Sequence, residues 1–307
     1  MPPHAAGTVR AATAPAADGA AVVPGQSARR SADGWEARLA LRFARRDDRS
    51  VLVERAHSGP LVVQKALHPE GPGVCQAIVV HPPGGIAGGD RLALSIDVLP
   101  RAHAQLATPG ATKWYRTAGA FARQAFAARV GAGAILEWLP HETIVFHGAR
   151  ALLSTTIELA GDALFLGWDI VCLGRTAHGE RFDKGVYRQR IDLVRDDALV
   201  WAERTNLPAG SRLLAAPAGL YGSPMFGTFV VAAPVIADDL LVACRGIAPD
   251  STGGVVVGAV TRLPGVLVAR CRGDSPETAR RWFTALWALV RPALIGRAAV
   301  PPRIWNT

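Results

Sequence analysis

The stretch HPPGGIAGGD, residues 81–90, places a histidine and an aspartate at the two ends of a glycine-rich connection. Imidazole and carboxylate groups are both ligands for divalent metal ions. Glycine-rich loops also bind phosphate, but they do so where they lead into a helix whose free N–H groups face the anion. After Asp90, RLALSIDV has Leu, Ile and Val at every second position, as in a strand, and the lysine of a nucleotide-binding loop is missing. The stretch therefore predicts a turn between strands, either structural only or with His81 and Asp90 as functional residues.

A second candidate pair lies in GRTAHGERFDKG, residues 174–185, a polar segment between two apolar strands. His178 and Glu180 are two residues apart, so an extended chain would place them on the same side, roughly 6–7 Å apart. Nickel and similar ions accept both imidazole and carboxylate ligands. Two ligands predict a weak, exchangeable site; the alternative is a solvated loop held by ion pairs.

Two further histidines, His141 and His147, lie in LEWLPHETIVFHGA, residues 136–149. Their spacing differs from the HExxH motif that places two zinc ligands on one face of a helix. In an extended chain they would be roughly 20 Å apart, too far to share an ion. We therefore interpret them as surface or capping histidines.

The stretch TPGATKWYRT, residues 108–117, contains a cationic and aromatic cluster, which consists of Lys113, Trp114, Tyr115 and Arg116. Trp, Tyr and Arg contribute most of the binding energy at protein interfaces, so the cluster is a candidate partner-binding patch. The alternative is a strand whose aromatic side chains face inward. No G-x-S-x-G motif is present, so the sequence gives no positive signal for a nucleophilic enzyme.

Alternation of apolar and polar residues begins at Trp35 and returns in many short segments separated by Gly or Pro. A period of two predicts strands with one buried face, so the chain is expected to be mainly β. Residues 1–32 are rich in Ala, Pro and Gly and predict a disordered tail. Residues 33–307 are expected to form a single β domain.

One segment, residues 275–291, has helical periodicity instead. Ser275 is its expected N-cap and Pro276 its first helical residue, while Pro292 and Gly296 are expected to end it. A second short helix is expected near residues 211–216.

The composition excludes several classes of protein. Lys and Arg outnumber Asp and Glu by 34 to 25, but the arginines are scattered rather than gathered on one stripe, which argues against nucleic-acid binding. The four cysteines never form a CxxC pair, so neither a zinc knuckle nor a redox dithiol is expected. No apolar run is long enough for a membrane helix, and the N-terminus lacks the apolar core of a signal peptide. A cytoplasmic protein is expected.

Taken together, these stretches resemble the urease accessory protein UreD family, which is also called UreH. The resemblance extends over residues 33–307 and rests on six segments in family order: GPLVVQKALHPEG, HPPGGIAGGDRL, TPGATKWYRT, LEWLPHETIVFHGA, GRTAHGERF and the terminal PPRIWNT. It implies stacked β-sheets with a β-helix-like course and about two helices.

The resemblance also implies a non-enzymatic role in urease maturation. Such a protein would bind UreF directly and the GTPase UreG through UreF, and would dock on apo-urease so that Ni²⁺ reaches the active site. No tightly bound cofactor is expected, and Ni²⁺ would bind transiently. Asp90 and Glu180 match acidic residues of the nickel path proposed for the family, with His81 and His178 beside them. His141 and His147 depart from the family pattern, so neither takes a role from it.

Two other functions remain open at this point. A metal-dependent hydrolase would use His81, Asp90, His178 and Glu180 as ligands and would hold its metal tightly. A purely structural interaction module would bind its partner without any contribution from these charged residues.

Overall fold

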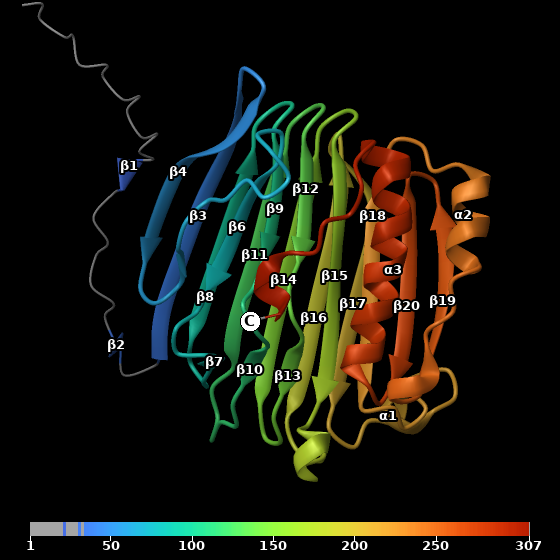
Figure 1. Ribbon diagram of the computed structural model, residues 1–307. Helices are drawn as coiled ribbons and strands as arrows, with labels where there is room; N and C mark the ends of the chain where they lie inside the picture. Colours follow the sequence, from blue (N-terminus) through green and yellow to red (C-terminus); the bar gives the residue numbers. More distant parts are fainter. Residues whose placement is uncertain (1–20, 23–29, 32–33, 307) are drawn as a thin grey trace, which may run out of the picture.

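The computed structural model describes residues 21–22, 30–31 and 34–306, and it folds them as two facing β-sheets with helices at one end (Figure 1). Most of the predicted tail, residues 1–32, lies outside the described residues. The two described pieces of that segment are the strands β1 (Ala21–Val22) and β2 (Arg30–Ser31), which pair with β4 and β3.

The first sheet has the strand order β1-β4-β3-β8-β11-β14-β16-β17. Its long strands are β3 (Gly34–Arg46), β4 (Arg49–Ser58), β8 (Arg91–Val98), β11 (Ala122–Val130), β14 (Arg150–Leu159), β16 (Val186–Arg195) and β17 (Ala198–Pro208).

The second sheet has the order β19-β20-β18-β15-β12-β9-β6-β5. Its strands are β5 (Val62–Val63), β6 (Cys75–Val80), β9 (His103–Ala107), β12 (Ile135–Leu139), β15 (Leu164–Leu173), β18 (Met225–Ala232), β19 (Val256–Leu263) and β20 (Val266–Gly273). The short strands β7 (Gly85–Ile86), β10 (Thr112–Trp114) and β13 (Thr143–Val145) pair beside this path.

The middle of the chain alternates between the two sheets, one strand in each. β8 precedes β9, β11 precedes β12 and β14 precedes β15, and the successive strands within each sheet are parallel. Each such pair is one coil of a solenoid, which confirms the expected β-helix-like course. After β16 the pairing becomes antiparallel, and β17 to β20 close one end of the stack.

The period-two pattern positions the core as the sequence predicts. Along β8 the residues Leu92, Leu94, Ile96 and Val98 are buried while their neighbours are more exposed. The same inward face recurs on β3, β11 and β14, so the apolar side chains of successive coils stack between the sheets.

The predicted C-terminal helix is present as α3 (Pro276–Ile295), on the outer face of the second sheet. Ser275 caps it as expected, since its hydroxyl accepts a hydrogen bond from Thr278 N. Of the two residues expected to end the helix, Gly296 does so, because its positive φ allows the left-handed cap, while the helix continues past Pro292 and past the expected limit at residue 291. The short helix near residue 211 is also present, as α1 (Arg212–Ala215).

Helix α2 (Asp238–Arg245) was not predicted. It is short and has no side-chain cap at Ala237, so it lacks the usual helix-start signal. Short 3₁₀ turns complete the fold as η1 (Thr176–His178), η2 (Ser251–Gly253) and η3 (Arg303–Asn306). Within the described part of the chain, no helix has the length and apolar character needed to span a membrane.

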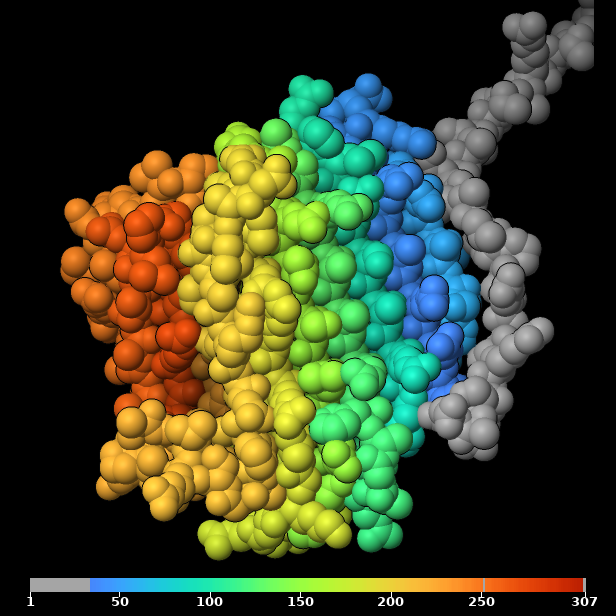
Figure 2. Space-filling view, turned by 180° about the vertical axis from the view of Figure 1, so that it is seen from behind, coloured from blue at the N-terminus to red at the C-terminus, as the bar shows by residue number. Residues whose placement is uncertain are grey.

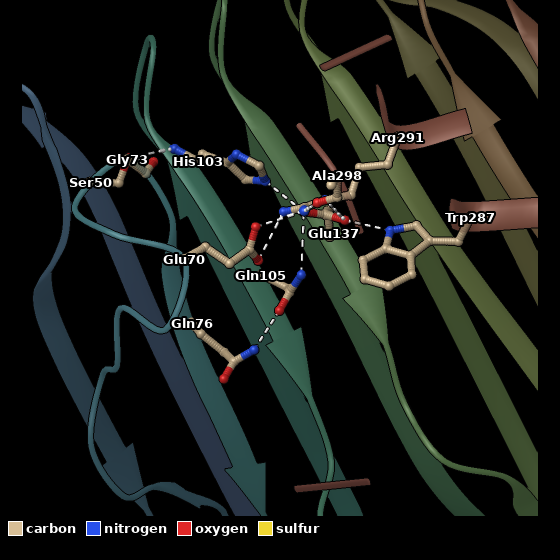
Figure 3. A network of polar contacts seen from close by, with 10 residues as sticks. All are labelled: Ser50, Glu70, Gly73, Gln76, His103, Gln105, Glu137, Trp287, Arg291 and Ala298. Atoms are coloured by element: carbon tan, nitrogen blue, oxygen red, sulfur yellow. Dashed lines mark hydrogen bonds and ion pairs between the residues drawn. The ribbon is translucent and has the colours of Figure 1, made fainter. Parts of the chain in front are cut away.

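A buried ionic network fixes α3 to the second sheet (Figure 3). Arg291 of the helix donates to Glu137 of β12 at 3.1–3.2 Å, and both side chains are fully buried. Trp287 Nε1 also donates to Glu137 at 2.6 Å, and His103 Nε2 lies 2.6 Å from the same carboxylate. Burial alone would raise the pKa of Glu137, but the contacts of His103, Arg291 and Trp287 hold it below its usual value.

Candidate functional site

An elongated cavity of about 470 Å³ lies between the two sheets. Its wall on the first sheet comes from five neighbouring strands, through Leu94, Phe126, Thr155, Ile191 and Trp201. Four spacings between strands at about 4.8 Å give the cavity a length of roughly 19 Å along the solenoid axis. The cavity therefore extends across several coils rather than lying within one of them.

Most of the wall is apolar, and a few polar side chains interrupt it. The polar and ionisable residues that line it are His81, Thr108, Thr112, Lys113, Gln124, His141, Thr143, Thr155, Asp169, Gln189 and Thr228. A few placed polar groups in an apolar cavity are typical of binding sites.

Among the described residues, Asp169 is the one carboxylate that lines the cavity. It lies on β15 and accepts a short hydrogen bond from Gln189 Nε2 of the opposite sheet. Burial raises the pKa of Asp169 from 3.8 to about 6; the Gln189 bond opposes this shift, and the charge of Glu203 adds to it. At neutral pH the group is therefore mainly a carboxylate with little compensation, which is the state that attracts a cation.

Near Asp169, the end of the cavity at β17 and β18 is bordered by more polar groups. Thr228 lines the wall and donates to Glu203 Oε1 at 3.3 Å. Arg270 binds the other oxygen of Glu203 at 2.6 Å. The Tyr187 hydroxyl is buried and has no hydrogen-bond partner among the described residues. This end of the cavity thus combines two carboxylates with an unpaired hydroxyl.

At the other end, His81 lines the wall after β6, whereas His141 lies just before β13, which pairs with β15, and is therefore on the Asp169 side. His81 Nδ1 and His141 Nε2 are both buried without a hydrogen-bond partner in the described part of the chain. Burial lowers the pKa of His81, and the nearby Asp90 carboxylate only partly offsets this. The neutral imidazole that results is the form that binds metals. The His141 side chain is 10% exposed and its Nδ1 lies 2.7 Å from Arg280 of α3, so of the two interpretations, surface or capping, the surface one was wrong for His141.

The connection at residues 81–90 has the predicted form: β6 and β8 flank it, the two-residue strand β7 lies within it, and no helix follows Asp90. Trp35 N donates to one oxygen of Asp90 at 2.8 Å, and Ala87 N donates to the other at 2.7 Å. Asp90 is buried and lies next to the cavity rather than in its lining. Its carboxylate therefore stabilises the turn by accepting from two backbone N–H groups. Each of its oxygens still has a lone pair that can accept another contact.

Glu180 and His178 lie at the loop after β15, but the loop is not extended. His178 belongs to the 3₁₀ turn η1 and is exposed, while Glu180 is half-buried. Arg175 donates to Glu180 Oε2 at 2.7 Å and lowers the pKa of that carboxyl. The backbone N–H of His147 donates to Glu180 Oε1 at 3.1 Å, so the structure brings Glu180 to His147.

The cluster at residues 113–116 is divided between the interior and the surface. Trp114 is 1% exposed and belongs to the core. Tyr115 is 37% exposed and stacks edge-on against Phe146, and Lys113 and Arg116 are exposed. A partner would meet Lys113, Tyr115 and Arg116.

In the part of the chain that the structure describes, no three His, Cys, Asp or Glu side chains converge as metal ligands. His81 and Asp90 are neighbours, as are His178 and Glu180 in sequence, but the four do not form one group. The four cysteines are free, and burial raises the pKa of each thiol, for Cys75 and Cys244 to about 11.

Asp169 and Glu203 were not selected from the sequence. Asp169 had a signal, since a carboxylate interrupts the apolar strand ALFLGWDIVCLG. Glu203 had none, because it lies in an ordinary alternating strand and its position follows from the distant contacts with Thr228 and Arg270.

Comparison with known proteins gives a consistent result. Residues 36–306 match the family model for the UreD urease accessory protein. A urease accessory protein UreD of Dechloromonas aromatica (strain RCB) is 54% identical over 276 residues, which cover 89% of this chain and 95% of that protein. Proteins of the same name from Azoarcus sp. (strain BH72) and Pseudomonas aeruginosa are 51% and 52% identical over 274 residues, with the same coverage. The chain belongs to the UreD family of urease accessory proteins.

Proposed function

We propose that this protein acts in urease maturation as a scaffold and a nickel conduit. In this role it binds UreF, and through UreF the GTPase UreG, on apo-urease in the cytoplasm. Ni²⁺ is a transient cargo that passes through the cavity between the sheets. The observation that carries the proposal is the elongated cavity with the ionisable carboxylate of Asp169 in its wall.

The ligands in the cavity wall are dispersed, which favours an ion that binds weakly and moves on over a metal that is bound permanently. A closed site with three or four ligands holds its ion tightly, whereas a conduit must release it. Asp169 lies opposite Gln189, His141 lies on the same side as Asp169, and the imidazole of His81 lies toward the other end. Scattered carboxylate and imidazole groups offer a divalent ion successive weak contacts.

Asp90 and Glu180 keep a proposed role at the margins of this path, with His81 and His178. Asp90 lies beside His81, and its charge acts on that imidazole. Glu180 is bound by Arg175 and is only half-buried, so in this proposal it attracts the ion from solvent rather than from within the cavity.

The proposal can be tested by expressing the urease genes and accessory genes with variants of this protein. Asp169→Asn keeps the shape of the side chain and removes its charge. Purified urease is expected to contain several-fold less nickel and to be correspondingly less active, while UreF still binds the variant. Asp90→Ala and Glu180→Ala are expected to have smaller effects.

A matched control is Glu158→Gln, which removes a carboxylate from the exposed face of strand β14 in the first sheet. It should leave the nickel content of urease unchanged. If urease matured with Asp169→Asn contains its full amount of nickel, the conduit role is rejected. If the wild-type protein does not bind UreF, the scaffold role is rejected.

A further inference from the structure

The two sheets do not end together. The first sheet ends at β17, while the second continues beyond β18 with β20 and β19. From the side of the first sheet, the orange residues of β19 and β20 lie uncovered beside the yellow edge of that sheet (Figure 2). We call this uncovered face the shelf, and define it by Val257, Ala259, Thr261 and Leu263 of β19 with Arg270 and Arg272 of β20.

The orientation of the shelf follows from its neighbours. A Cβ at Gly258 would meet the Trp282 ring of α3, so that residue faces the helix side. Val257 and Ala259, on either side of it, therefore face the opposite way, as Arg270 does in reaching Glu203 on β17. Helices α2 and α3 cover one face of these strands. On the other face the β19 residues and Arg270 are exposed and Arg272 is partly exposed, while Val266 and Val268 of β20 are buried in the core between the sheets.

The shelf is apolar at one side and cationic at the other. Val257 is 55% exposed and Leu263 is 42% exposed, although both are β-sheet residues of high hydrophobicity. Among the described residues Arg272 makes no ion pair; it contacts Ser223 Oγ at 3.4 Å and lies over the Tyr221 ring. Exposed apolar side chains grouped with aromatic and arginine residues mark protein interfaces.

The wall of the shelf is the free edge of β17. This strand of 11 residues hydrogen-bonds to β16 and to no other described strand. A long edge offers unpaired backbone N–H and C=O groups to another protein. The shelf therefore combines an apolar floor, a polar wall and positive charge.

The occupant is a different protein rather than a second copy. The chain carries a net charge of +9, which opposes self-association through arginines. The charge of the shelf instead matches a partner with carboxylates around apolar side chains.

We propose that the shelf docks UreF, through a UreF surface that carries carboxylates around apolar side chains. This inference rests on the scaffold role proposed above. It places UreF against β17, next to the Glu203 end of the cavity, so that one partner covers both the shelf and that end of the cavity.

The test measures binding of purified cognate UreF to immobilised full-length protein by interferometry. Val257→Asp with Leu263→Asp is expected to weaken binding at least tenfold, and so is Arg272→Glu. The matched control is Val242→Asp on α2, which is 68% exposed and lies on the covered side of β19. It should bind like wild type. Wild-type binding should also weaken as salt is raised.

A second arm changes the other candidate patch, with Tyr115→Ala and Arg116→Glu. Loss of UreF binding in this arm, with normal binding by the shelf variants, would overturn the shelf and assign the interface to residues 113–116. Binding that is insensitive to salt would also contradict it. Failure of the wild-type protein to bind UreF would instead reject the scaffold role. Circular dichroism and melting of every variant show whether each one is folded.

Discussion

Arg270 holds the carboxylate of Glu203 with two donors, Nη2 at 2.6 Å and Nε at 3.0 Å. This ion pair joins the last strand of the first sheet to β20 of the second, next to the wall of the cavity. The Glu203 side chain is 14% exposed and the Arg270 side chain 55%. An arginine at the surface thus neutralises a carboxylate beside the cavity.

Because Glu203 is mostly buried, loss of Arg270 leaves its charge poorly compensated. Arg270→Ala is expected to lower the free energy of unfolding by roughly 0.5–1 kcal/mol, an amount limited by the exposure of the arginine. Arg129→Ala, which breaks the more exposed pair with Glu158, should cost less. Urea denaturation measures both, and equal costs would contradict the buried character of Glu203.

Asp169→Asn is expected to stabilise the protein at neutral pH. The pKa of Asp169 is raised from 3.8 to about 6, so the folded state binds its proton more tightly and loses stability as pH rises through that window. A difference of about two units predicts a gain of roughly 1–3 kcal/mol for the variant above pH 6 and none below pH 3.8. Thermal melts across this range measure it. If the variant is less stable than the wild type at pH 7, the buried charge of Asp169 does not lower the free energy of unfolding.

Glu137→Gln is expected to destabilise the protein, because Arg291 would lose one of its two buried carboxylate partners and keep only Glu70. Removing one charge from a buried pair costs roughly 3–5 kcal/mol. The pKa of Glu137 is lowered, so its stabilisation is present above the usual pKa of 4.5 and is lost as pH falls through the lowered value. The wild type and the variant should therefore converge in acid. If the free energies of unfolding of the wild type and the variant differ by the same amount at all pH values, the loss of stability comes from the changed shape of the side chain and not from its charge.

Gly34→Ala is expected to disturb the turn that holds Asp90. Gly34 has φ of +122°, and an added Cβ would lie 2.6 Å from Asp90 N and overlap the Gly89 carbonyl carbon. We expect a loss of roughly 2 kcal/mol or more, measured by denaturation. Gly84→Ala is the control, since Gly84 also has a positive φ of +69° but has open space around it. Similar losses for both would leave backbone strain as the only cause.

Much of the fold could be predicted from the sequence, because alternation at period two records which side of a strand is buried. The strand after Asp90 and the cap at Ser275 are local features of this kind. The cavity could not be predicted, because its wall joins strands that are far apart in the chain. Asp169 and Gln189 meet across two sheets, and no spacing within either strand reports that contact.

For the predicted site residues too, the local structure could be predicted but the contacts between distant segments could not. Asp90 and Glu180 lie in turns that are visible in the sequence, and the structure shows backbone N–H groups bound to both. The partner of Glu180 in space is His147, which lies on another coil. Whether Asp90, Glu180, His81 and His178 contact Ni²⁺ stays a prediction for the variants above.

The most direct test of the conduit blocks the cavity without changing charge. Thr155 lines the wall on β14, and its neighbour Ser154 is exposed on the opposite face of the same strand. Nickel is measured in urease matured with Thr155→Trp and with Ser154→Trp, after both variants are shown to be folded and to bind UreF. If Ni²⁺ travels through the cavity, urease matured with Thr155→Trp will be poor in nickel, and urease matured with Ser154→Trp will be fully loaded. Fully loaded urease with Thr155→Trp would show that Ni²⁺ does not travel between the sheets.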